Sequence, residues 1–145
     1  NQAGVARGFF TEEFVHEIND IIKADLLQHG AVIDEFYYCP HHPEHGKGEY
    51  LQNCNCRKPA PGMLLQAALE LNIDLSRSYF IGDRLIDMET AKNVGAKGVL
   101  VKTGYGENLL RAEGPDTATP ENEPDFVAAD ILEAVLLILK DRKHK

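Results

Sequence analysis

Short, continuous apolar runs alternate with segments of helical periodicity along this chain, and that alternation limits its fold more than any other feature. The runs expected to form strands are residues 31–38, 78–81, 98–101 and 126–128. The segments expected to form helices are residues 12–29, 62–71, 86–94 and 131–140. Continuous apolar strands separated by helices are typical of a parallel sheet covered on both faces. We therefore predict the α/β class, with residues 1–8 as a loop before the first helix.

The composition bounds the partners of the chain. A length of 145 residues, with 43% hydrophobic and 26% charged residues, is ordinary for one globular domain. Fifteen Lys and Arg against 23 Asp and Glu give a net charge of −8, which disfavours binding to nucleic acid. The longest apolar run, residues 134–139, is far below the ~20 residues of a membrane span. We expect a monomeric cytoplasmic protein that binds neither nucleic acid nor membrane.

A loop rich in Cys and His interrupts the periodic pattern between residues 39 and 61. Within it lie Cys39, His41, Cys54 and Cys56, with twelve residues between the histidine and the second cysteine. Three thiolates and one imidazole are a full tetrahedral set for Zn²⁺, and a site with no open position is structural. We predict that zinc holds the segment 39–56 and offsets the entropic cost of ordering it.

Three other interpretations of this loop stay open. Cys54 and Cys56 resemble a redox pair, although such pairs usually have two intervening residues rather than one. His42 or His45 can replace His41 as the fourth ligand. The three thiols can also be unrelated to one another. Their odd number argues against a fully paired disulfide framework.

Two cations follow the last cysteine directly. Arg57 and Lys58 precede Pro61, which is expected to begin a helix. A helix N-terminus attracts anions, Lys acts as a point charge on phosphate, and Arg adds bidentate hydrogen bonds. The pair therefore predicts an anion-binding corner, although such a pair is more often a solvated part of the surface.

Carboxylates follow the second predicted strand. Asp83 comes directly after the run 78–81, and Asp87 lies four residues further on. Ligands of parallel sheets bind at the carboxyl ends of the strands, and carboxylates there suit Mg²⁺, which also grips phosphate. Either aspartate can instead cap the helix that follows.

Taken together, these motifs resemble the haloacid dehalogenase (HAD) superfamily of phosphatases. Within it the chain is most similar to the D-glycero-D-manno-heptose 1,7-bisphosphate 7-phosphatase family, from Asn1 to about Gly106. The most specific segments are residues 38–43 and 54–63. The histidinol-phosphate phosphatases also carry a zinc loop, but with a shorter gap between the His and the Cys-x-Cys, so they are the alternative. The resemblance implies a Rossmann-like three-layer α/β/α fold with a zinc-bound loop insertion.

The resemblance also implies a role for each matching residue. It implies Mg²⁺ as the catalytic cofactor, Zn²⁺ as the structural one and a small sugar phosphate as substrate. Lys58 matches the lysine that stabilises phosphate, and Asp83 matches the Mg²⁺ ligand, with Asp87 considered as an indirect partner of that ion. The residues implied to bind substrate are Asn1, Gln2, Arg57, Lys58 and Arg84. The zinc ligands carry over to Cys39, His41, Cys54 and Cys56.

One motif of the family is missing from the sequence. An Asp attacks phosphorus to form an aspartyl-phosphate, and a second Asp two residues later protonates the leaving oxygen. No Asp-x-Asp occurs in these 145 residues. We expect a single phosphatase domain over residues 1–145 that is incomplete at its N-terminus, with the nucleophile upstream and the chain inactive alone. The alternative of another class is a non-catalytic, zinc-stabilised binding module, which has no need of Lys58 and Asp83.

Overall fold

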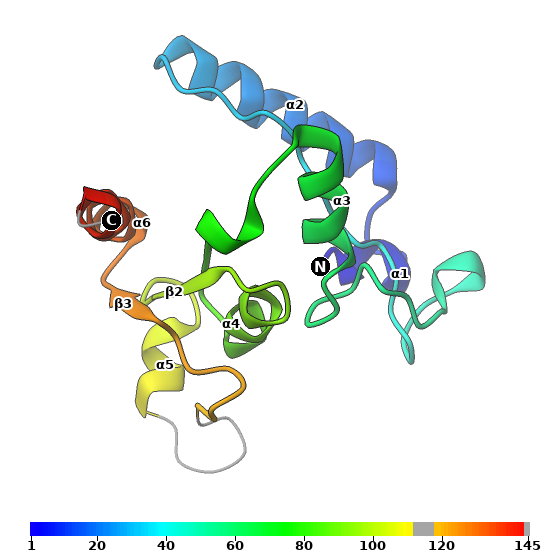
Figure 1. Ribbon diagram of the computed structural model, residues 1–145. Helices are drawn as coiled ribbons and strands as arrows, with labels where there is room; N and C mark the ends of the chain where they lie inside the picture. Colours follow the sequence, from blue (N-terminus) through cyan, green and yellow to red (C-terminus); the bar gives the residue numbers. More distant parts are fainter. Residues whose placement is uncertain (112–117, 144–145) are drawn as a thin grey trace. The chain divides into compact units, whose positions relative to one another are not determined.

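The computed structural model describes residues 1–111 and 118–143 of the chain (Figure 1). The chain divides into two units, Asn1–Arg57 and Lys58–Lys145, and each is described by itself. The expectation of one domain over residues 1–145 stays a prediction. Among the described residues, no helix has both the length and the apolar character needed to cross a membrane.

The first unit opens with a short helix, α1 (Ala3–Arg7), where the sequence predicted a loop. That prediction was wrong because Val5 and Ala6 are apolar residues that the turn buries, leaving 3% and 0% of them exposed. The helix ends at Gly8, whose φ of 74° is the left-handed conformation that glycine adopts without strain.

The long helix of the first unit begins where the sequence predicted. This helix is α2 (Glu12–Gln28), and the Thr11 hydroxyl caps it by accepting a hydrogen bond from the Phe14 amide at 3.3 Å. At the other end, the Gly30 amide donates to the carbonyl of Leu27 at 3.0 Å. The observed helix therefore agrees with the predicted range 12–29 to within one residue.

The strand predicted at residues 31–38 does not form. In the described part of the first unit, the pairing between extended segments is one isolated parallel bridge, between His42 and Leu51. A strand exists only through the backbone hydrogen bonds of a partner, so β-branched and aromatic residues alone do not make one. The segment is instead an extended connection from α2 to Cys39.

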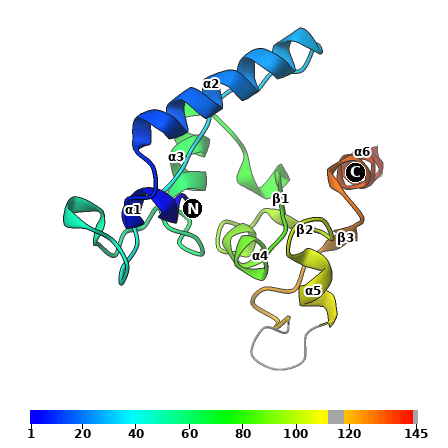
Figure 2. The ribbon, with the colours of Figure 1, turned by 180° about the vertical axis from the view of Figure 1, so that it is seen from behind.

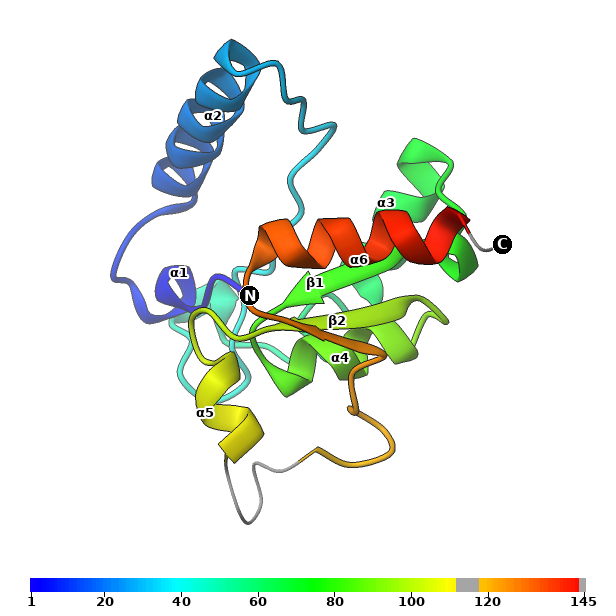
Figure 3. The ribbon, with the colours of Figure 1, turned by 90° about the vertical axis from the view of Figure 1, so that its left-hand side faces the viewer.

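The second unit contains the sheet (Figures 2 and 3). Its strands are β1 (Tyr79–Gly82), β2 (Lys97–Val101) and β3 (Phe126–Ala128), all parallel and in the order β1-β2-β3. Its helices are α3 (Gly62–Leu71), α4 (Leu85–Lys92), α5 (Gly106–Arg111) and α6 (Ile131–Lys143), with short 3₁₀ turns at Leu75–Arg77 here and Gly48–Tyr50 in the first unit. The predicted α/β class with a parallel sheet is confirmed.

Helices α4 and α6 lie on opposite faces of this sheet, as Figure 3 shows. Successive residues of β2 alternate between the faces. A Cβ added at Gly98 would lie 2.9 Å from Sδ of Met88 in α4, so glycine allows the close approach of that helix. Val99 instead belongs to the buried cluster that includes Ala134 of α6. These contacts make three layers, helix on sheet on helix, as expected.

The last helix, α6, has a side-chain cap at its N-terminus. The carboxylate of Asp130 caps α6 by accepting from the Glu133 amide at 2.9 Å. The composition of residues 113–124, which is acidic and contains several prolines, predicts a surface loop. Residues 113–117 lie outside the described part of the chain, and residues 118–124 contain turns but no helix or strand. The last two residues of the basic tail, 144–145, also lie outside the described part.

Candidate metal centre and active site

Four side chains of the first unit converge in the Cys/His loop. The ligand atoms of Cys39, His41, Cys54 and Cys56 all lie within 4.8 Å of one another. Sγ of Cys54 is 3.5 Å from Sγ of Cys39 and 3.1 Å from Sγ of Cys56, and Nδ1 of His41 is 3.4 Å from Sγ of Cys56. Zinc–sulfur bonds of about 2.3 Å in a tetrahedron give S–S edges of about 3.8 Å. The group can therefore hold zinc with only small movements of its side chains.

Backbone contacts fix this loop. The Gln2 amide donates to the carbonyl of Cys39 at 2.8 Å, which ties the first ligand to the start of α1. The His42 amide donates to the carbonyl of Tyr50 at 3.0 Å, and Nη1 of Arg57 donates to the carbonyl of His41 at 3.0 Å. Arg57, which the resemblance assigns to substrate binding, thus also bonds to the segment 39–56, the metal loop.

The three thiols titrate differently. Burial raises the pKa of Cys39, whose residue surface is 0% exposed, and burial together with the Cys54 contact raises the pKa of Cys56. Burial also raises the pKa of Cys54, but hydrogen bonds from Cys56, Cys39 and His41 outweigh it and lower that pKa to about 7. Because metals bind thiolates, loading of this site releases protons.

The geometry of the loop favours one of its interpretations. The four gathered side chains include His41, whereas Nδ1 of His42 accepts the amides of Glu44 and His45 at 3.1 and 3.0 Å. The thiols are free and share one cluster with an imidazole, which favours metal binding over three unrelated thiols or an isolated redox pair.

In the second unit, the carboxyl end of β1 carries the predicted magnesium ligand. Asp83 follows Gly82, the last residue of β1, and its Oδ2 accepts a hydrogen bond from the Tyr105 amide at 3.1 Å, just beyond β2. Mg²⁺ typically takes one or two carboxylates together with waters and phosphate oxygens, so the half-buried carboxylate of Asp83 fits as one such ligand. The guanidinium of Arg84, the next residue, stacks 4.1 Å from the centre of the Tyr105 ring.

Lys58 and Asp87 form an ion pair in the same unit. Nζ of Lys58 lies 2.5 Å from Oδ1 of Asp87, whose residue surface is 3% exposed. The other oxygen, Oδ2, accepts the amide of Arg84 at 3.1 Å and so caps α4. The capping role considered for Asp87 is confirmed, while its indirect role toward a metal stays a prediction.

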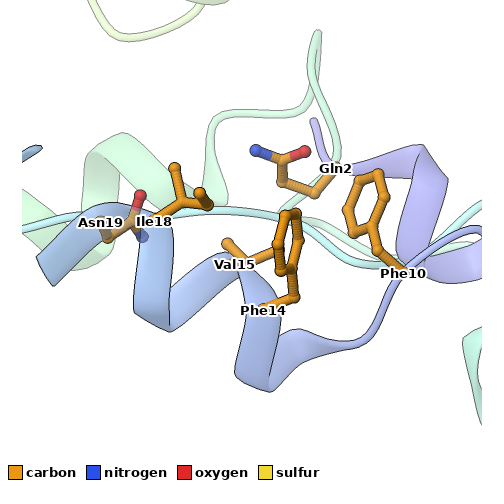
Figure 4. A pocket seen from close by; sticks show the side chains of 6 residues that line it. All are labelled: Gln2, Phe10, Phe14, Val15, Ile18 and Asn19. Atoms are coloured by element: carbon orange, nitrogen blue, oxygen red, sulfur yellow. The ribbon is translucent and has the colours of Figure 1, made fainter. Parts of the chain in front are cut away.

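Gln2, predicted to bind substrate, lines a small cavity of about 120 Å³ in the first unit. In Figure 4 its amide lies near the rings of Phe10 and Phe14, with Ile18 further along α2. The substrate role of Gln2 and of Asn1 stays a prediction.

Sequence reasoning missed two features beside these sites. The charge of Glu12 suits the N-terminus of α2, but its carboxylate also accepts hydrogen bonds from the hydroxyls of Tyr38 and Tyr50. Tyr105, which follows the end of β2, has a ring over which the guanidinium of Arg84 lies. The available signal was weak: Tyr38 directly precedes Cys39, and Tyr105 lies between two glycines.

Comparison with known proteins places the chain. The family model described as "HAD-hyrolase-like" matches residues 55–134. The chain belongs to this HAD-like family. The superfamily resemblance carried by its motifs is thereby confirmed, and the parallel sheet with Asp83 at a strand end is the HAD-like part of the molecule.

Several curated relatives of this HAD-like chain are named D-glycero-β-D-manno-heptose-1,7-bisphosphate 7-phosphatase. One from Pasteurella multocida is 51% identical over 105 residues, covering 72% of this chain and 56% of that protein. One from Yersinia pestis is 44% identical over 140 residues, covering 93% of this chain and 69% of that protein. The matches thus span between about half and 70% of these relatives' lengths.

A solved structure is also similar. It is the D,D-heptose 1,7-bisphosphate phosphatase from B. bronchiseptica complexed with magnesium and phosphate. The TM-score is 0.79 at 34% sequence identity, and the match covers 97% of this chain and 72% of that one.

Proposed function

We propose that the natural polypeptide carrying these residues is a magnesium-dependent phosphomonoesterase. Its substrate is D-glycero-β-D-manno-heptose 1,7-bisphosphate, from which it removes the phosphate at C7. The single observation that carries the proposal is the placement of Lys58 and Asp83 in a HAD-like unit whose curated relatives are named D-glycero-β-D-manno-heptose-1,7-bisphosphate 7-phosphatase. A solved relative complexed with magnesium and phosphate supports the metal and the ligand class.

In this proposal, four residues of the second unit have defined tasks. The ammonium of Lys58 neutralises the charge of the transferring phosphoryl group, and the carboxylate of Asp83 supplies an oxygen ligand for Mg²⁺. Bound Mg²⁺ adds positive charge where the phosphoryl oxygens develop negative charge. The guanidinium of Arg84, which lies over the ring of Tyr105, presents a fork of N–H donors to the substrate. Asp87 fixes Lys58 and the start of α4.

Residues of the first unit recognise the substrate and hold a structural metal. In the proposal, Asn1, Gln2 and Arg57 bind the sugar phosphate, and the loop 39–56 keeps its shape because Zn²⁺ binds Cys39, His41, Cys54 and Cys56. The protein acts as a cytoplasmic monomer on a small molecule, and the net charge of −8 supports a partner other than nucleic acid.

The covalent step uses an aspartate that these residues do not supply. The 145 residues contain no Asp-x-Asp pair, so the proposal assigns the nucleophile and the general acid to residues outside them. The carboxylate attacks phosphorus, the sugar oxygen leaves with a proton from the acid, and water then hydrolyses the aspartyl-phosphate. Residues 1–145 contribute phosphate binding, metal binding and recognition.

A substrate comparison tests the proposal. The natural polypeptide, purified with Mg²⁺, is assayed for phosphate release from the heptose bisphosphate and from histidinol phosphate. We expect turnover of the heptose bisphosphate at least tenfold more efficient than that of histidinol phosphate, and its loss on chelation of Mg²⁺. Faster turnover of histidinol phosphate would favour the alternative substrate, and turnover of neither would favour a non-catalytic binding module.

A further inference from the structure

One carboxylate of the first unit connects two parts of the metal loop. One arm is the part around Tyr38 and Cys39, and the other arm is the part from Tyr50 to Cys54. Oε2 of Glu12 accepts the hydroxyl of Tyr38 at 2.7 Å, and Oε1 accepts the hydroxyl of Tyr50 at 3.0 Å. Tyr38 directly precedes the ligand Cys39, and Tyr50 lies four residues before Cys54. Each oxygen of Glu12 therefore binds a different arm of the segment that brings the four ligands together.

Further contacts make these two phenols part of the metal loop. The Tyr50 carbonyl accepts the amide of His42, and the Tyr50 ring lies 6.4 Å from the ring of the ligand His41. The Tyr38 hydroxyl also lies 3.0 Å from Nε2 of His16 in α2. The arms pass so closely that a Cβ added at Gly46 would lie 2.6 Å from the amide nitrogen of Leu51. We therefore expect a shift of either phenol to change the positions of the four metal-binding side chains.

The neighbouring carboxylate shows that Glu12 is more than a helix-terminal charge. Glu12 and Glu13 both lie in the first turn of α2, where a negative charge is favourable. Glu12 is half-buried and accepts both phenols, whereas Glu13 is exposed and its side chain bonds to the cap residue Thr11. The two residues share charge and helix position but differ in their contact with the loop.

We propose that Glu12 is a positioning residue of the metal loop, which it holds close to the metal-binding geometry by accepting one phenol from each arm. The proposal rests on the assignment of zinc to Cys39, His41, Cys54 and Cys56. A long loop that must order itself when the metal binds loses affinity, because the ordering entropy offsets the binding free energy. A carboxylate that holds both arms beforehand removes part of that loss.

Zinc affinity of the 145-residue chain tests the proposal. Zinc is titrated against a chromophoric chelator, and cobalt absorption reports the ligand geometry. Glu12→Gln keeps the side-chain size and removes the charge, and we expect it to weaken zinc binding about tenfold, the low end for a hydrogen bond to a charged group. Tyr38→Phe and Tyr50→Phe each weaken it less. The tetrahedral cobalt spectrum persists in all three, because the ligands are unchanged.

A matched control and a double-mutant cycle separate positioning from a general effect on α2. Glu13→Gln removes the same charge from the same helix turn, and we expect unchanged zinc affinity. Glu12→Gln combined with Tyr50→Phe should weaken binding by less than the product of the single effects, because both remove one interaction. Circular dichroism of the metal-free variants reports the helix content, and Tyr50→Phe, which deletes one hydroxyl, serves if Glu12→Gln fails to fold.

Three results would overturn the proposal. Wild-type zinc affinity in Glu12→Gln shows that the Glu12 hydrogen bonds to Tyr38 and Tyr50, the clamp, do not affect metal binding. An equal loss in Glu13→Gln shows that the effect is helix charge. Absence of zinc binding by the wild-type chain removes the zinc assignment and the clamp together, and leaves the phosphatase proposal to its own substrate assay.

Discussion

Nζ of Lys58 lies 2.5 Å from Oδ1 of Asp87, and the other oxygen of the same carboxylate accepts the backbone amide of Arg84. One aspartate thus connects the residue proposed to bind phosphate with the first turn of α4, which follows Asp83. The fit is tight, because a Cβ added at Gly82 would overlap the side chain of Asp87. The lysine proposed to bind phosphate is therefore held by the same carboxylate that accepts the amide of Arg84 at the start of α4.

Removing the charge of Asp87 is expected to destabilise the second unit. The side chains of Asp87 and Lys58 are 5% and 20% exposed, so loss of the carboxylate charge removes a close anionic partner from a largely buried ammonium. Asp87→Asn keeps an acceptor for the Arg84 amide, and we expect it to lower the free energy of unfolding by about 2 kcal/mol, as for the loss of a hydrogen bond between charged groups. Asp87→Ala also removes the cap and should cost about 1 kcal/mol more. Urea unfolding followed by circular dichroism measures both.

The control for Asp87 is Glu89→Gln, which removes a negative charge from the same helix without touching the pair. We expect a change below about 0.5 kcal/mol, as for an ordinary surface substitution. If Asp87→Asn and Glu89→Gln had equal effects, the Lys58–Asp87 pair would contribute nothing specific to stability.

Zinc removal is expected to loosen the loop 39–56. The His42 amide, bonded to Tyr50, and the Lys47 amide, bonded to the Ala6 carbonyl, lie in this loop. Because zinc binding supplies part of the free energy that orders the loop, chelation should accelerate hydrogen exchange at both amides. The Ile73 amide, bonded to Ala68 in the second unit, is the internal reference.

Substitution of the histidines tests the ligand assignment. His41→Ala should lower zinc content, measured by atomic emission, from one ion per chain toward none. His42→Ala and His45→Ala should retain the ion, because His42 uses Nδ1 to accept two amides and neither residue joins the cluster. Zinc loss in His42→Ala with retention in His41→Ala would contradict the assignment.

Much of the fold could be predicted because its signals are local. Helix α3 matches its predicted bounds, and β3 lies where the short apolar run indicated. Thr11 and Asp130, which belong to the residue types that favour helix N-termini, cap α2 and α6. Residues 31–38 have the same β-favouring composition but no partner strand among the described residues. Strand formation depends on long-range pairing, which the composition of one segment does not report.

The candidate sites show the same division. The gathering of the three cysteines and His41 could be predicted because soft side chains in one aperiodic loop are typical of a metal site. The Glu12 contacts could not, since they join residues 26 and 38 positions apart with no shared motif. The stacking of Arg84 on Tyr105 likewise depends on how two strand ends meet, which no spacing in the sequence encodes.

Alkaline pH is expected to weaken the first unit through Tyr38. Burial, followed by the hydrogen bond to Glu12, raises the pKa of Tyr38 to about 12 from an ordinary value near 10. The folded state therefore favours the protonated phenol, so its stabilisation is complete below about pH 10 and is lost as the pH rises toward 12. Unfolding midpoints across this range should fall further for the wild type than for Tyr38→Phe. Parallel curves would contradict the raised pKa.

The 145 residues by themselves are expected to have no phosphatase activity. They carry the proposed phosphate and metal ligands but no Asp-x-Asp, and without the nucleophile the covalent step has no acceptor. The measurement is phosphate release by the isolated chain with Mg²⁺ and zinc present. Magnesium-dependent turnover that is lost in Lys58→Met would contradict the expectation and require a nucleophile within residues 1–145.

The most direct test of the proposed function is the position of the phosphate that is lost. Phosphorus NMR follows D-glycero-β-D-manno-heptose 1,7-bisphosphate during incubation with the natural polypeptide and Mg²⁺. We expect the signal of the C7 phosphate to disappear as inorganic phosphate grows, the signal of the C1 phosphate to persist, and Lys58→Met to abolish the change. Loss of the C1 phosphate, or a rate unaffected by Lys58→Met, would contradict this expectation.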